Sequence, residues 1–135
     1  AAEAVLAWRQ VERLQPNYPM LPVMLAQALI ARNPPANAEA LVQLRQAERL
    51  TPDDPEVYYL EGRIHVSEGR YAEAVGYLER ALRLRPAMAN WYYQLGLAYQ
   101  RLGKTAQAKE QFERMNHLRG QATAGEPEGR SGPAR

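Results

Sequence analysis

The chain has 135 residues, which is enough for one domain, and 46% of them are hydrophobic. It contains no cysteine, which excludes thiol catalysis, disulfide bonds and cysteine-ligated metal sites. The formal net charge of +2 is not the basic footprint of a nucleic-acid-binding protein, and no apolar run is long enough to insert into a membrane.

The first predicted element is a helix over residues 3–14. Its apolar residues Ala4, Trp8 and Val11 share one face by helical spacing. We expect this stripe to be exposed, and exposed apolar stripes usually mark interfaces. Two explanations are open: the chain was cut from a longer array, or the stripe pairs with a second copy. We favour truncation, with homodimer formation by the fragment as its consequence.

The rest of the chain repeats every 34 residues, which divides it into units 21–54, 55–88 and 89–119. The matching columns contain small, large and aromatic residues in a fixed order. They include Ala28, Gly62 and Gly96; Met24, Tyr58 and Tyr92; Ala40, Ala74 and Ala108; and Leu44, Leu78 and Phe112. Each unit is predicted to form two helices, so the fold class is all-α.

The middle unit has the clearest helix boundaries. Its first helix is predicted over residues 55–68, with Asp54 as the N-cap, and it ends at Gly69. Its second helix is predicted over 71–84. Because Gly62 has no side chain, the two helices can approach closely at that point.

The last predicted helix covers residues 105–118. Its polar residues, among them Gln111 and His117, surround an apolar stripe, so we expect it to face water and cap the array. Gly120 stands where the earlier units have a proline, and residues 120–135 contain no aromatic, Leu, Ile or Val. We therefore interpret 120–135 as a disordered tail or linker.

The 34-residue helix–turn–helix pattern resembles the tetratricopeptide repeat. The third unit shows the resemblance most plainly, in Tyr92, Leu95-Gly96, Tyr99, Ala108 and Phe112. Residues 1–18 match the second helix of a further repeat at an offset of 36, so two extra residues are placed near Pro19-Met20. The resemblance implies a right-handed superhelical solenoid of antiparallel helix pairs, with three repeats after an N-terminal half-repeat.

The resemblance also implies that the first helices line a concave groove that binds an extended segment or a helix of another protein. The candidate groove residues are Leu25, Leu29, Arg32, Tyr59, Arg63, Tyr93, Leu97 and Arg101. We hypothesise that Tyr59, Arg63 and Tyr93 anchor a partner segment that bears an acidic and an apolar residue. The alternative is that both tyrosines cover neighbouring helices and the arginines are solvated.

The known chaperone-binding function of this family does not fit. Its two-carboxylate clamp needs Lys and Asn at positions that here hold Leu25 and Leu29. Catalysis has no support either, because the sequence shows no nucleophile–base pair and no phosphate-binding loop. His65 follows Glu61 by four residues, but two ligands make a poor metal site, so we expect a packed histidine and neither metal nor cofactor.

The leading hypothesis is therefore a non-catalytic scaffold that binds a protein or peptide partner in its groove. One alternative is a structural or oligomerisation module that uses its ends. Another is the accessory domain of a larger enzyme. We expect a soluble protein and place the cytoplasm ahead of the periplasm or secretion, although no residue distinguishes these compartments.

Overall fold

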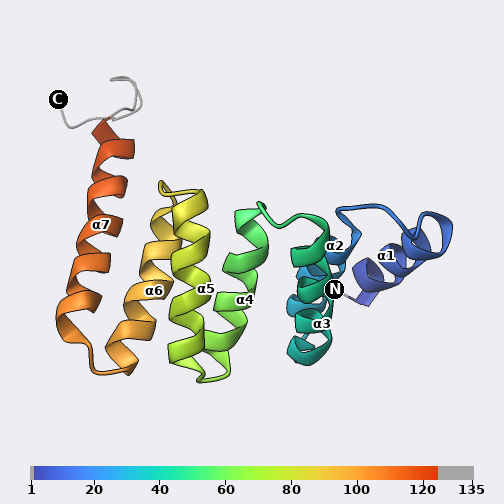
Figure 1. Ribbon diagram of the computed structural model, residues 1–135, viewed down its shortest axis with the longest axis horizontal. Helices are drawn as coiled ribbons and strands as arrows, with labels where there is room; N and C mark the ends of the chain where they lie inside the picture. Colours follow the sequence, from blue (N-terminus) through green and yellow to red (C-terminus); the bar gives the residue numbers. More distant parts are fainter. Residues whose placement is uncertain (1, 125–135) are drawn as a thin grey trace.

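The computed structural model describes residues 2–124, and within them the chain forms seven α-helices and no strand. They are α1 (Ala2–Leu14), α2 (Leu21–Ile30), α3 (Asn37–Leu50), α4 (Pro55–Ser67), α5 (Tyr71–Leu84), α6 (Ala89–Arg101) and α7 (Thr105–Ala124). The helices stand in a row from α1 at one end to α7 at the other (Figure 1).

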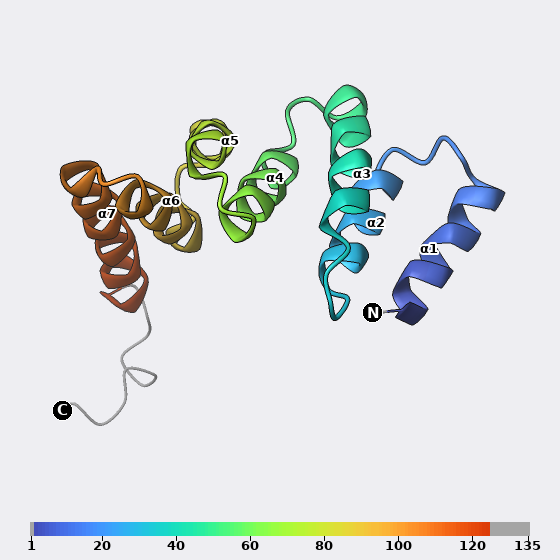
Figure 2. The same ribbon diagram turned by 90° about the horizontal axis from the view of Figure 1, so that it is seen from below.

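Each helix packs mainly on its neighbours in the sequence, and α4 also contacts α6. Figure 2 shows α4 and α6 on one side of the row and α5 on the other. Two buried clusters form the core, one across α2, α3 and α4 and one across α4 to α7. The all-α solenoid of antiparallel helix pairs is confirmed.

Small residues allow the two helices of a pair to approach closely. A Cβ atom on Gly62 of α4 would lie 2.7 Å from Cγ of Leu78 on α5. A Cβ atom on Gly96 of α6 would lie 2.5 Å from Cε1 of Phe112 on α7. Real Cβ atoms do not come so close to other heavy atoms, so these two positions require glycine.

The predicted ends of the middle helix are confirmed. The Asp54 carboxylate accepts a hydrogen bond from the Glu56 N–H at 3.0 Å, and Pro55 occupies the first helical position. At the other end Gly69 adopts φ +79°, the left-handed conformation that glycine tolerates best.

The turn that leads into α2 corresponds to the turn that leads into α4 at an offset of 36 residues. Before α2, Tyr18 N–H donates to Gln15 O at 3.1 Å, and Leu21 N–H donates to Tyr18 O at 3.1 Å. The same bonds recur as Asp54 N–H to Thr51 O at 3.1 Å and Val57 N–H to Asp54 O at 3.2 Å. No residue is therefore inserted near Pro19-Met20, which corrects the sequence prediction.

The two extra residues lie instead in the turn between α2 and α3. Ala36 N–H bonds to Leu29 O, seven residues back, whereas Arg70 N–H bonds to His65 O, five residues back. The turn contains Asn33-Pro34, and a residue that precedes proline disfavours helical geometry. The chain therefore leaves α2 early and needs a longer turn to reach α3.

This insertion shifts the register of α2 by two residues relative to the sequence alignment. Ala26, and not Ala28, is the counterpart of Gly62. Ala26 is fully buried in the same cluster as Ala40 and Leu44 of α3, as the small position of a helix pair should be.

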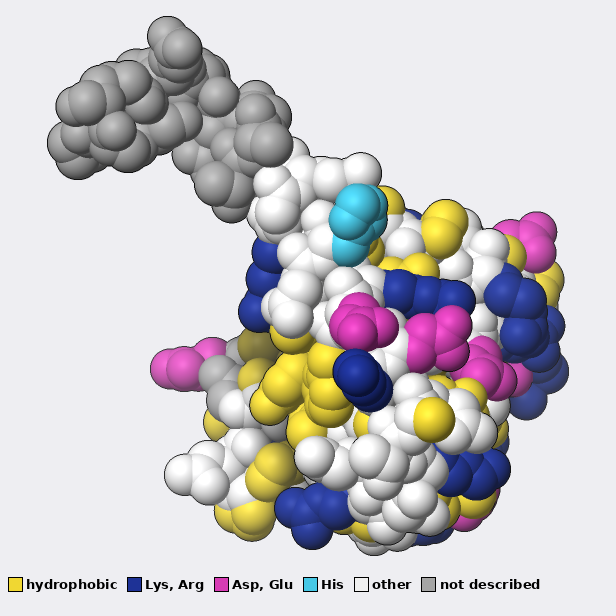
Figure 3. All heavy atoms as spheres, turned by 90° about the vertical axis from the view of Figure 1, so that its left-hand side faces the viewer, with side chains coloured by type: hydrophobic (Ala, Val, Ile, Leu, Met, Phe, Trp, Pro, Cys, Tyr) yellow, Lys and Arg dark blue, Asp and Glu magenta, His cyan; other side chains and the backbone are white. Residues whose placement is uncertain are grey.

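The last helix is longer than predicted. α7 passes Gly120 and continues to Ala124, because glycine weakens a helix but, unlike proline, keeps its N–H donor. The expected tail therefore cannot begin at 120, and residues 125–135 lie outside the described residues. Figure 3 looks onto the α7 end, where charged side chains of both signs alternate with hydrophobic ones.

Candidate functional site

The structure corrects the candidate groove residues of α2. Leu25 and Leu29 are both 0% exposed, so neither can contact a partner at the surface. Arg32 is exposed but lies in the turn after α2 and not on the helix. The two-residue register shift explains these differences, because it places Gln27 and Ile30 where the uncorrected alignment had put Leu29 and Arg32.

Gln27 and Ile30 of α2 face α4 across a cavity of about 200 Å³. Tyr59 and Arg63 of α4 line its other side. A second cavity of about 350 Å³ is also lined by Ile30 and Arg63, together with Asn37 from the start of α3. Arg63 and Ile30 therefore border two adjacent hollows between the first helix pair and α4.

Arg63 is an exposed cation on α4. Among the residues that the structure describes, it forms none of the ion pairs. Glu56, which lines the smaller of the two cavities, lies 4.0 Å from Arg85, the residue that follows α5. Burial raises the pKa of the Glu56 carboxyl, while the charges of Arg85 and, less strongly, Arg63 lower it. Arg63 therefore keeps its donors available for a ligand.

Tyr59 is already used in packing. Its ring stacks on Trp91 of α6, with centroids 4.8 Å apart and planes 12° from parallel. Trp91 is buried, and Arg85 lies 5.5 Å above its ring. Burial raises the pKa of the Tyr59 hydroxyl. Tyr59 therefore covers a neighbouring helix, as one sequence interpretation expected, and it also borders a cavity, as a residue that anchors a partner would.

The α6 candidates are reached more easily by solvent. Tyr93 is 42% exposed, and its ring centroid lies 6.0 Å from that of Phe112. Leu97 is half-buried, and Arg101 is the exposed last residue of α6. Neither cavity beside Arg63 includes these three residues.

The N-terminal stripe is partly covered. Ala4, Trp8 and Val11 are half-buried. Trp8 and Val11 line an open cleft of about 340 Å³ with Leu14, which is 72% exposed, and Tyr18. The corresponding residues of α3 are buried beneath α2.

His65 is a packed histidine, as predicted. It is buried, its Nδ1 accepts a hydrogen bond from Nε of Arg70 at 2.8 Å, and its ring stacks on Tyr77 at 5.2 Å. Burial lowers the pKa of the imidazole, and the Arg70 charge lowers it further. Within residues 2–124 no group of three or more His, Asp or Glu side chains could hold a metal ion.

Sequence reasoning missed Gln27 and Ile30 as cavity residues. A usable signal was present, because Gln15-Pro16-Asn17-Tyr18-Pro19 resembles Thr51-Pro52-Asp53-Asp54-Pro55 at an offset of 36. That match, together with the two prolines after Asn33, indicates that the two extra residues lie in the turn between α2 and α3.

Comparisons with known proteins agree with this architecture. Residues 62–103 match a family model described as TPR repeat. No curated protein matches the chain. None of the described helices has the length and apolar character needed to cross a lipid bilayer.

Several solved structures share the fold. A crystal structure of MamA is 24% identical, with a TM-score of 0.76, over 84% of this chain and 66% of that chain. MamA 41-end from Desulfovibrio magneticus RS-1 is 23% identical, with a TM-score of 0.78, over 87% and 66%. The MamA RS-1 ArsTM double mutant is 22% identical, with a TM-score of 0.81, over 90% and 67%. The chain spans about two thirds of the length of these proteins.

Proposed function

We propose that the chain, whose residues 62–103 match a TPR-repeat model, is a non-catalytic scaffold that binds a segment of a partner protein along α2, α4 and α6. The fold supplies no chemistry of its own, so the proposal depends on the side chains that these helices present. The chemistry of the partner follows from the two cavities between α2 and α4.

The observation that carries the proposal is the position of Arg63. It is exposed, has no ion-pair partner among the described residues and borders both cavities. Planar guanidinium groups bind carboxylates through two parallel hydrogen bonds. Ile30 offers an apolar contact in the same two cavities. A segment that pairs an acidic residue with a neighbouring apolar residue fits both features.

The aromatic residues extend this surface toward α6. Tyr59 is held in place by Trp91, so it offers a rigid ring edge that loses little side-chain entropy on binding. Tyr93 is more exposed and provides a further contact. Aromatic and arginine side chains are enriched among the residues that contribute most to binding energy.

The experiment is a selection from a phage-displayed random peptide library on the full chain. We expect enriched peptides that contain Asp or Glu next to an apolar residue. Arg63→Ala should lose these peptides. The matched control is Arg49→Ala, which removes an exposed arginine of α3 that borders neither cavity.

Enriched peptides without an acidic residue would contradict the proposed role of Arg63. Peptides that bind the Arg63→Ala variant as well as the original chain would contradict it too. If the selection enriched no peptide at all, the scaffold proposal itself would lose its support.

Self-association through α1 is a second candidate, and the open cleft beside Trp8 and Val11 favours it. Leu14 and Leu6 are 72% and 70% exposed, so the helix displays apolar surface at its edges. A second copy that packed its own α1 there would make an isologous contact.

A further inference from the structure

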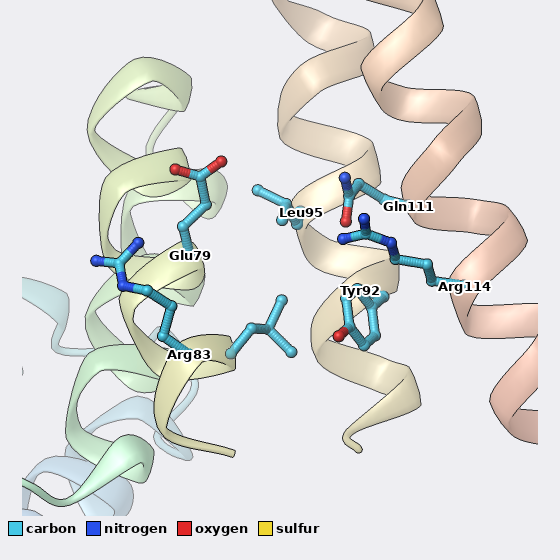
Figure 4. Close-up of a pocket in the computed structure, with 7 residues that line it drawn as sticks. Glu79, Arg83, Tyr92, Leu95, Gln111 and Arg114 are labelled. Atoms are coloured by element: carbon cyan, nitrogen blue, oxygen red, sulfur yellow. The ribbon is translucent and has the colours of Figure 1, made fainter. Parts of the chain in front are cut away.

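A separate cleft lies where side chains of α5, α6 and α7 face one another, with a volume of about 320 Å³ (Figure 4). It is lined by Glu79, Leu82 and Arg83 of α5, Tyr92 and Leu95 of α6, and Gln111 and Arg114 of α7. Pockets that bind small ligands have volumes of about 300–1,000 Å³. The cleft shares no lining residue with the cavities beside Arg63.

The preceding repeat shows why this cleft is open. At an offset of 34 residues, Gln111 corresponds to Tyr77, whose ring reaches His65 and stacks on it at 5.2 Å. Arg114 corresponds to Arg80, whose guanidinium lies 4.4 Å above the Tyr58 ring. Where the earlier repeat has a large aromatic side chain, the last repeat has a shorter amide, which leaves room for a ligand.

Gln111 was expected to face water, but it is only 6% exposed. Its Oε1 atom is buried and has no hydrogen-bond partner among the described residues. Figure 4 shows Gln111 and Arg114 projecting from α7 toward Leu95 and Tyr92. A buried acceptor without a partner is uncommon, and a water molecule or an N–H group of a ligand would satisfy it.

The other polar groups of the cleft are partly engaged. Oε2 of Glu79 accepts a hydrogen bond from the Tyr99 hydroxyl at 2.5 Å. Burial, together with this carboxylate, raises the pKa of Tyr99 to about 12, so the hydroxyl remains a donor. Arg114 pairs with Glu110 at 2.9 Å through one nitrogen, on the exposed side of the helix. A guanidinium has five N–H groups, so Arg114 can bind a further acceptor.

We propose that this cleft binds an acidic peptide segment of a partner protein. A carboxylate side chain contacts Arg114, and a backbone N–H of the segment donates to Oε1 of Gln111. An apolar side chain packs on Tyr92 and Leu95. A free inorganic anion satisfies Arg114 but offers no donor for Gln111, which is why a peptide fits the cleft better.

The test is an NMR titration of the ¹⁵N-labelled full chain, read at the side-chain amide of Gln111. The probe is the acetylated dipeptide amide Ac-Leu-Glu-NH₂, with Ac-Leu-Lys-NH₂ as the charge-reversed comparison. We expect a saturable shift with a Kd of about 0.1–10 mM, as suits a fragment of this size. The lysine peptide should produce no saturable shift.

Two variants show where the probe binds. Gln111→Tyr copies Tyr77 and should abolish binding by filling the cleft, read at the backbone amides of α7. Arg114→Gln should weaken binding at least about five-fold, because it removes the charge-assisted hydrogen bond. Arg80→Gln is the matched control in the preceding repeat and should leave the affinity unchanged.

Three results would overturn the proposal. One is the absence of a saturable shift up to about 20 mM probe, beyond the affinity range of such fragments. The second is an equal response to the lysine peptide. The third is unchanged affinity in the Arg114→Gln variant, which alters an exposed side chain and should stay folded.

Discussion

Gly62 of α4 lies directly against Leu78 of α5, and no space for a methyl group remains between them. A Cβ atom on residue 62 would stand 2.7 Å from Cγ of Leu78 and 2.8 Å from its Cδ2. Leu78 is fully buried in the core cluster of α4 to α7. This contact sets how closely the central helix pair packs.

We expect Gly62→Ala to lower the free energy of unfolding by about 1–3 kcal/mol, because overpacking outweighs the better helix propensity of alanine. The matched control is Gly76→Ala in α5, where an added Cβ meets no atom within 4 Å. That change should stabilise the protein by about 0.5–1 kcal/mol. Urea denaturation measures both. Equal effects of the two substitutions would contradict the close contact.

The register of α2 can be tested in the same way. Ala26→Ile should cost about 1–3 kcal/mol, because Ala26 occupies the small position against α3. Ala28→Ile should cost less, because its counterpart in α4 is Ile64. Thermal unfolding of the two variants ranks them. The reverse order would restore the 34-residue alignment of this helix.

Glu61 is expected to destabilise the protein above acidic pH. It is 0% exposed, and neither carboxylate oxygen has a hydrogen-bond donor among the described residues; Glu48 can accept a hydrogen bond from Glu61 only when Glu61 is protonated. Burial, reinforced by Glu48, raises the pKa of Glu61 far above its ordinary value of 4.5. The folded chain therefore holds a proton that the unfolded chain releases above pH 4.5, so stability falls as pH rises.

Glu61→Leu should remove this penalty, since leucine occupies the corresponding positions 25 and 95. We expect a gain of about 1–4 kcal/mol at pH 8.5 and a smaller gain at pH 6.5. In that window His65, whose pKa is lowered, stays largely neutral when folded and does not produce the same trend. Urea denaturation at both pH values provides the test. Parallel pH profiles for the two proteins would refute the assignment to Glu61.

The apolar surface of α1, formed by Trp8, Val11 and Leu14, leads us to expect self-association. Sedimentation equilibrium should show a homodimer whose dissociation constant rises at least about ten-fold in Trp8→Gln, since aromatic anchors contribute strongly to interfaces. Leu50→Gln is the control, because Leu50 is an exposed leucine of α3 outside the α1 surface. Circular dichroism confirms that both variants fold. A monomer at all concentrations would eliminate this candidate.

Most of the fold could be predicted from the sequence, because particular residue types in each repeat determine where helices begin, end and pack closely. Asp54 caps a helix, Gly69 adopts the left-handed conformation, and Gly62 permits close approach. The predicted register of α2 was wrong for a specific reason. This helix is apolar on nearly every face, so its hydrophobic pattern did not reveal which residues point inward.

The candidate site was predictable only where the repeats are regular. Arg63 and Tyr93 are exposed on their helices as helical spacing indicated, whereas Leu25 and Leu29 followed the shifted register into the core. The two cavities beside Arg63 depend on how the first helix pair meets α4. The open cleft at Gln111 depends on the size of one side chain relative to Tyr77. Neither feature is encoded in the spacing of a single repeat.

The most direct test of the scaffold proposal is a double-mutant cycle between Arg63 and the acidic residue of a selected peptide. Isothermal titration calorimetry would measure the affinities for both forms of each partner. The account predicts a coupling energy of about 1–3 kcal/mol. Either single substitution already removes the charge-assisted pair, so the second substitution should cost little further affinity. A coupling energy near zero would show that the acidic residue binds elsewhere and would contradict the proposed groove.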